Sequence, residues 1–168
     1  MTKAIFFDRD DTIIIDKNYL HKTEDVEFFS DTLSSLRLLQ ENNYDFYMVS
    51  NQSGVGRGYF KEESVWEIFD FINKHMVEIG IKPFIDLAFC PHSPSNNCEC
   101  RKPKTKMLKD LSLKYRLKKE NCLFVGNNLC DYDCGLNFQI KSYIINNPKL
   151  SDHPAYFSNL EKLTHAII

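Results

Sequence analysis

Five short apolar runs, each followed by polar residues, are the feature that most constrains the fold of this chain. The runs are rich in β-branched and aromatic side chains and occupy residues 4–7, 44–49, 85–90, 122–125 and 143–145. Apolar residues at helical spacing occupy the segments 31–41, 61–79 and 104–116, and a last helix is expected near 157–167. Strands that alternate with helices predict an α/β fold whose parallel sheet is covered on both faces.

The chain length of 168 residues suits one domain with a sizeable core, so we treat residues 1–168 as a single domain. The net charge of −2 disfavours a dedicated nucleic-acid binder, which usually carries a basic face. No run approaches the length of a membrane-spanning helix, and the N-terminus shows no signal-peptide pattern. We therefore expect a cytoplasmic monomer with no membrane contact.

Polar clusters follow four of the apolar runs. They are Asp8 to Asp10, Ser50 to Gly54, Cys90 to His92, and Gly126 to Asn128. In parallel α/β sheets, ligands bind beyond the carboxyl ends of the strands. The four clusters therefore predict a single functional site at this edge of the sheet.

Asp8 and Asp10 suit phosphoryl transfer. One carboxylate can attack phosphorus, while the other protonates the leaving oxygen and then deprotonates water. Carboxylates beside a buried strand need a compensating charge, and Mg²⁺ prefers oxygen ligands. An acidic turn after a strand is the alternative interpretation.

Two further segments could bind phosphate. Backbone N–H groups in the Ser50–Gly54 turn could cradle it, although an ordinary capped loop would look the same. Arg101 and Lys102 add fixed positive charge: Lys102 could stabilise the attacked phosphoryl group, and Arg101 could grip a substrate phosphate with two hydrogen bonds.

Four residues within the loop 90–100 have the spacing of metal ligands: Cys90, His92, Cys98 and Cys100. Three thiolates and one imidazole form a closed tetrahedral set, which is typical of structural zinc. Free cysteines are the alternative. The remaining cysteines are interpreted as small core residues.

In combination, these motifs resemble the haloacid dehalogenase superfamily of aspartyl-phosphate phosphatases. The resemblance runs from Ala4 to about Ile145 and is strongest to the small capless branch that holds heptose bisphosphate and histidinol phosphate phosphatases. It implies a three-layer, Rossmann-like fold with no cap domain and a short zinc-binding loop. The matching motifs are Asp8-Arg9-Asp10, Ser50-Asn51-Gln52-Ser53-Gly54, the zinc loop, Arg101-Lys102-Pro103-Lys104, and Val125-Gly126.

The resemblance also implies residue roles. Asp8 resembles the nucleophile, Asp10 the general acid and base, and Ser50 and Lys102 the phosphate-binding pair. The implied Mg²⁺ ligands are Asp8, the backbone carbonyl of Asp10, and the residue at position 127. The implied substrate-binding residues are Asp16, Tyr19, Asn51, Gln52, Ser53, Arg57, Arg101 and Asn128.

Segments 16–21 and 51–60 resemble those of the heptose bisphosphate phosphatases. The favoured substrate and partner is therefore a small phosphorylated metabolite, a heptose bisphosphate. Histidinol phosphate stays open, because only five residues separate His92 from Cys98 and such short loops are familiar in histidinol phosphatases. A phosphatase acting on nucleic-acid ends is a further alternative, which the absence of a broad basic face disfavours.

Two residues depart from the pattern of the superfamily. Asp11 stands where glycine is usual, at a position that favours unusual backbone angles. Asn127 stands where an aspartate usually binds Mg²⁺, and Asn brings no charge. We predict weaker Mg²⁺ binding, with Asp131 compensating through water, and we keep a catalytically weak phospho-ligand-binding protein as an alternative.

Overall fold

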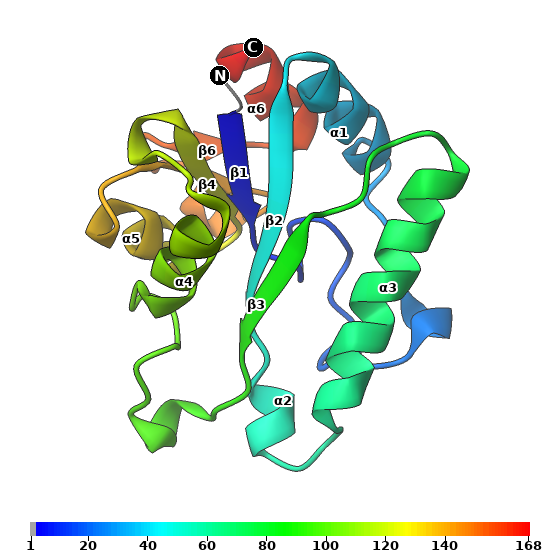
Figure 1. Ribbon diagram of the computed structural model, residues 1–168, viewed down its shortest axis with the longest axis vertical. Coiled ribbons are helices and arrows are strands. Elements are labelled where there is room, and N and C mark those ends of the chain that lie inside the picture. The colour runs from blue at the N-terminus through cyan, green and yellow to red at the C-terminus, as the bar shows by residue number, and fades with distance from the viewer. Residues whose placement is uncertain (1–2) are drawn as a thin grey trace.

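The computed structural model describes residues 3–168, and it contains a six-stranded parallel sheet in the order β3-β2-β1-β4-β5-β6 (Figure 1). The strands are β1 (Lys3–Phe7), β2 (Tyr44–Asn51), β3 (Asp86–Cys90), β4 (Cys122–Gly126), β5 (Lys141–Ile145) and β6 (Tyr156–Phe157). The predicted α/β fold and its five longer strands are confirmed. The sequence pattern did not indicate β6, which occupies the beginning of the expected C-terminal helix.

Helices cover both faces of the sheet, which gives three layers (Figure 1). These helices are α1 (Thr32–Glu41), α3 (Glu62–Glu78), α4 (Lys106–Tyr115), α5 (Leu129–Asn137) and α6 (Leu160–Ile167), while the four-residue α2 (Ser53–Gly56) lies beyond the end of β2. Alternation along β1 serves both cores: Ile5 and Phe7 pack with α1, α3 and α6, whereas Ala4 and Phe6 pack with α4 and α5.

The strand order brings the first and fourth strands together at the centre of the sheet. After β1 the chain moves outward through β2 and β3, then returns so that β4 lies on the other side of β1. Ligands bind at such a switch point in doubly wound sheets. Residues that follow β1 and β4 therefore meet at the place where a site is expected.

The segments that follow the first two strands contain little regular structure. Within residues 3–168, the segment between β1 and α1 holds one 3-10 turn, Thr23–Asp25, and the segment between β2 and α3 holds only the four-residue α2. Neither of these two described segments folds into a separate domain. None of its described helices combines the length and the apolar character that crossing a membrane requires.

Candidate active site

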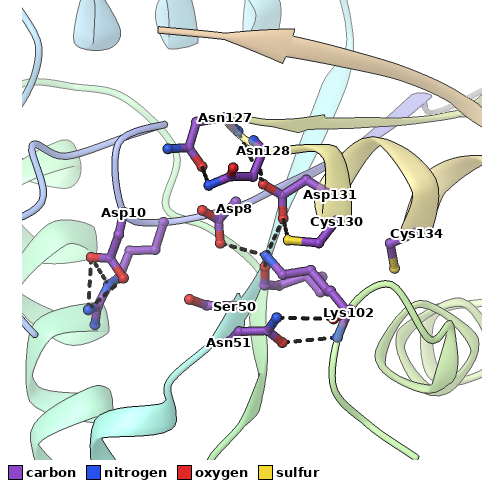
Figure 2. Close-up of polar contacts among 12 residues, drawn as sticks. Asp8, Asp10, Ser50, Asn51, Lys102, Asn127, Asn128, Cys130, Asp131 and Cys134 are labelled. Atoms are coloured by element: carbon purple, nitrogen blue, oxygen red, sulfur yellow. Dashed lines mark hydrogen bonds and ion pairs between the residues drawn. The ribbon is translucent and has the colours of Figure 1, made fainter. Parts of the chain in front are cut away.

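Asp8, Lys102 and Asp131 form a buried ion-pair network at the switch point (Figure 2). Lys102 Nζ lies 2.6 Å from Asp8 Oδ1 and 2.7 Å from Asp131 Oδ1, and it also donates to the carbonyl oxygen of Val49 at 2.9 Å. Each of the three charged side chains is at least nine-tenths buried. Burial without pairing would be costly for each charge, so the three stabilise one another.

The network has more negative than positive charge. Burial is the largest cause of the raised pKa of Asp8, about 7; Asp131 and Asp10 act in the same direction, and Lys102 opposes them. Burial would lower the pKa of Lys102, but Asp131 and Asp8 raise it above its ordinary value. Two carboxylates therefore share one ammonium group, and a cation beside Asp8 would balance the remaining charge.

Asp131 is fixed by the loop that follows β4. Its Oδ2 accepts backbone N–H groups of Asn127 at 3.2 Å and Asn128 at 3.1 Å. A Cβ added to Gly126 would lie 2.3 Å from Asp131 Cβ, so this close approach requires glycine. Both carboxylate oxygens of Asp131 are engaged, by Lys102 and by the loop. The expectation that Asp131 compensates for Asn127 through water stays a prediction.

Asn127 lies beside Asp8 at this edge (Figure 2). Asn147 Nδ2 donates to the backbone carbonyl of Asn127 at 2.8 Å, and Asn128 Nδ2 donates to Asn127 Oδ1 at 3.4 Å. The side chain of Asn128 also takes part in the capping box that begins α5. The oxygen atoms of Asp8, Asn127 and the carbonyl of Asp10 are a donor set of the kind that Mg²⁺ prefers.

Asp10 is held by a buried arginine that the sequence analysis did not assign to the site. Arg9 is 2% exposed, and its Nε and Nη2 donate to the two oxygens of Asp10 at 2.9 and 3.0 Å. Gln52 Nε2 donates to Asp10 Oδ2 at 2.9 Å and to Ser50 Oγ at 2.7 Å. The predicted catalytic residues Asp10 and Ser50 are thus joined through the side chain of Gln52.

Asn51 holds the main chain of Lys102. Its Oδ1 accepts the N–H of Lys102 at 3.0 Å, and its Nδ2 donates to the carbonyl of Lys102 at 3.3 Å (Figure 2). This paired contact joins the end of β2 to the loop before α4, and so fixes where the Lys102 ammonium lies. Asn51 was expected to bind substrate, but both ends of its amide are occupied here.

A cavity of about 330 Å³ opens beside Asp10. Its lining is polar and comes from two loops: Asp10, Asp16, Asn18 and Tyr19 from the first, and Asn51, Gln52, Ser53 and Gly54 from the second. Five of the predicted substrate residues therefore gather around one hollow. Arg57 is exposed at the end of α2, and Arg101 Nη1 donates to the carbonyl of His92 at 3.4 Å; neither these two nor Asn128 lines the cavity.

Cys90, His92, Cys98 and Cys100 converge at the end of β3. Their ligand atoms all lie within 4.8 Å of one another; Cys90 ends β3, and the other three residues come from the loop that follows it. Burial is the largest cause of the raised pKa of Cys90, about 12, and a hydrogen bond between Cys90 and Cys100 adds to it. Closely packed sulfur atoms of this kind could hold a metal ion.

Comparisons with known proteins agree with this geometry. A family model described as polynucleotide kinase 3 phosphatase matches residues 3–147. The chain belongs to this phosphatase family. As the resemblance predicted, the family falls within the haloacid dehalogenase superfamily.

Two relatives of similar sequence are named as phosphatases of a heptose bisphosphate. The chain is 39% identical to D-glycero-alpha-D-manno-heptose-1,7-bisphosphate 7-phosphatase of Campylobacter jejuni, across 96% of this chain and 94% of the relative. It is 31% identical to D-glycero-beta-D-manno-heptose-1,7-bisphosphate 7-phosphatase of Helicobacter pylori, across 90% and 88%.

A solved structure of the same fold is D,D-heptose 1,7-bisphosphate phosphatase from B. bronchiseptica, complexed with magnesium and phosphate. It has a TM-score of 0.88 and 21% identity, and the match covers 98% of this chain and 97% of that one.

Proposed function

We propose that this phosphatase hydrolyses the 7-phosphate of D-glycero-D-manno-heptose 1,7-bisphosphate through an aspartyl-phosphate at Asp8, as a single catalytic domain. The observation that carries the proposal is the buried Asp8 carboxylate, held at 2.6 Å by Lys102, with the second carboxylate, Asp10, two residues further along the chain. A purely binding protein would not need both a nucleophile and a proton donor in this arrangement.

The chemistry uses two steps. Lys102 engages Asp8 Oδ1, so Oδ2 is the oxygen that attacks phosphorus. The new bond joins Asp8 to phosphorus, the bond from phosphorus to the sugar oxygen breaks, and Asp10 gives its proton to that oxygen. Asp10 then takes a proton from water, whose oxygen attacks phosphorus and releases phosphate from Asp8.

Positive and polar groups support both steps. The Lys102 ammonium offsets charge on Asp8 and on the transferred phosphoryl group, and Ser50 Oγ accepts a hydrogen bond from the Gln52 amide that also binds Asp10. Arg9 and Gln52 fix the carboxylate of Asp10 on the side of the cavity. These contacts hold the proton donor, Asp10, and the nucleophile, Asp8, in position before substrate binds. Such positioning of the reacting groups in advance lowers the barrier to the reaction.

Two metal ions fit the residues. Asp8, Asn127 and the Asp10 carbonyl would hold Mg²⁺, which would neutralise phosphate charge and balance the excess negative charge of the buried network. The four-residue cluster would hold structural zinc: its sulfur atoms are 3.2 to 3.6 Å apart, close to the ~3.8 Å edge of a tetrahedron with Zn–S bonds of ~2.3 Å. With four protein ligands, this zinc would have no open position for water.

The cavity supports a polyhydroxylated substrate. Its lining offers carboxylates, amides and hydroxyls but no lysine or arginine among the eight residues that form it. Such groups exchange hydrogen bonds with sugar hydroxyls. Arg57, which is exposed just outside this lining, is the proposed contact for the second phosphate of a bisphosphate.

The decisive experiment measures phosphate release with Mg²⁺ from both anomers of the heptose bisphosphate, from histidinol phosphate, and from a 3′-phosphorylated oligonucleotide. Asp8→Asn is the control. Turnover of the heptose bisphosphate that is lost in Asp8→Asn supports the proposal, and the preferred anomer follows from the rates. Turnover of another substrate alone, or of none, contradicts it.

A further inference from the structure

Asp11 adopts a backbone conformation that is costly for a residue with a side chain. Its φ is +54°, in the left-handed region where glycine is comfortable and other residues are strained. Aspartate tolerates this region better than most residues, because its short side chain can hydrogen-bond locally. Here the Oδ1 of Asp11 accepts the backbone N–H of Asp16 at 2.8 Å, a contact that glycine could not make.

The segment that begins at Asp16 is itself strained. Asn18 and Tyr19 have successive φ values of +57° and +67°. Such conformations persist when surrounding contacts determine them. The ring of Tyr19 packs edge-on against Tyr59 with centroids 4.8 Å apart, which joins this segment to the loop after α2.

The two neighbours of Asp10 hold the two ends of this segment. Asp11 holds the N–H of Asp16, and Arg9 Nη2 donates to the carbonyl oxygen of Leu20 at 3.1 Å. The same arginine group binds the carboxylate of Asp10. Arg9, Asp10 and Asp11 therefore connect the proton donor, Asp10, to the segment 16–20, which forms one wall of the cavity.

We propose that Asp11 is a specificity-positioning residue, which places the wall 16–20 against Asp10 so that the wall contacts the part of the substrate beyond the reacting phosphate. The inference rests on the proposed function. Asp16, Asn18 and Tyr19 line the cavity beside Asp10, whereas Asp11 is not among its lining residues and acts through the wall. A small displacement of this wall would change substrate binding more than the chemistry at Asp8.

The test compares Asp11→Gly with Asp11→Asn. Glycine removes both the strain and the acceptor, whereas asparagine keeps an acceptor oxygen and tolerates the left-handed conformation. The substrates are the heptose bisphosphate and p-nitrophenyl phosphate, which has the phosphate but no sugar. For Asp11→Gly, the ratio of kcat/KM for the bisphosphate to that for p-nitrophenyl phosphate should fall about tenfold, mainly through KM of the bisphosphate, as expected for one lost hydrogen bond to a charged group.

The matched variant Asp11→Asn should keep this ratio within about threefold. An unchanged ratio in Asp11→Gly, or an equal loss with both substrates, would overturn the proposal. A purely structural role would lower thermal stability and leave the ratio unchanged.

A second readout separates this proposal from the proposed function. Hydrogen exchange at the Asp16 amide should be about tenfold faster in Asp11→Gly than in the wild type and in Asp11→Asn, since only glycine lacks the acceptor. If the wild type hydrolyses p-nitrophenyl phosphate but not the heptose bisphosphate, the proposed function fails. The exchange measurement then still tests the hydrogen bond between Asp11 and the Asp16 amide. Equal exchange in all three proteins would overturn the role of Asp11 whichever substrate is used.

Discussion

Asn127→Asp should strengthen Mg²⁺ binding and weaken the metal-free protein. Above pH 7, where Asp8 is ionised, Asp8, Asp131 and Lys102 together carry a net charge of −1, and the substitution makes it −2. Two unit charges about 4 Å apart interact by about 1 kcal/mol even with the dielectric constant of water. The doubly charged ion therefore gains at least about 2 kcal/mol, which corresponds to roughly 30-fold in Kd.

Without metal, the neighbouring carboxylates repel the added carboxylate. The backbone N–H of Asn127 lies 3.2 Å from Asp131 Oδ2, so the new charge would stand close to existing negative charge. A repulsion of about 1 kcal/mol lowers Tm by roughly 2–4 °C for a chain of this size. In EDTA the variant should thus melt lower than the wild type, and in saturating Mg²⁺ it should melt higher.

Isothermal titration calorimetry gives the Kd, and thermal unfolding with EDTA or Mg²⁺ gives the two shifts. Asn43→Asp is the matched control, because it adds the same charge at an exposed position directly before β2, at the end of the sheet opposite the site. We expect its Kd to change by less than about threefold, as for an exposed charge screened by water. An Asn127→Asp protein with the Kd of the wild type, or with shifts of the same sign in both buffers, would refute the reasoning.

Four further outcomes follow from the site. Gly126→Ala should lower the free energy of unfolding by about 1–3 kcal/mol in urea titrations, because the new methyl would overlap Asp131. Cys100→Ser should lower the zinc content found by mass spectrometry and lower Tm; unchanged zinc would contradict the assigned ligand set. Lys102→Met should destabilise the protein by about 3–5 kcal/mol, because two buried carboxylates lose their partner. In EDTA, the contribution of Asp8 to the free energy of unfolding should be full below pH 3.8 and lost as the pH rises towards about 7, because the pKa of Asp8 is raised in the folded protein. Saturating Mg²⁺ should flatten this pH dependence, and denaturant titrations at a series of pH values measure it.

The sheet could be predicted from the sequence because each strand is marked by residues that are neighbours along the chain. Each of the five longer strands is a continuous apolar run, and each expected helix has an apolar face at helical spacing. The helix α5 was not predicted, since its nine residues include Asp131 and Gly135, and it begins in the loop that follows β4. Its helical character depends on the capping box of Asn128 and on packing against β5.

The convergence of Cys90, His92, Cys98 and Cys100 could also be predicted, because their spacing is short; the catalytic roles of Asp8 and Asp10 stay predictions. The position of Arg9 could not be predicted, since an arginine beside a strand end normally indicates exposure. Its burial depends on Asp10 and on Gln52, which is 43 positions away along the chain. The hydrogen bonds between Asn51 and Lys102 could not be predicted for the same reason, because these residues are 51 positions apart along the chain.

The central position of β1 has a consequence for synthesis of the chain. Its neighbours are β2 and β4, and β4 begins at Cys122, more than a hundred residues after β1 ends at Phe7. At ribosomal rates of about 5–20 residues per second, one edge of this apolar strand waits roughly 6–25 s for its partner. The ion pair between Asp8 and Lys102 likewise spans 94 positions. The nascent protein therefore carries an unpaired hydrophobic edge and an incomplete active site until most of it has been made, which makes this interval the one in which chaperones would matter most.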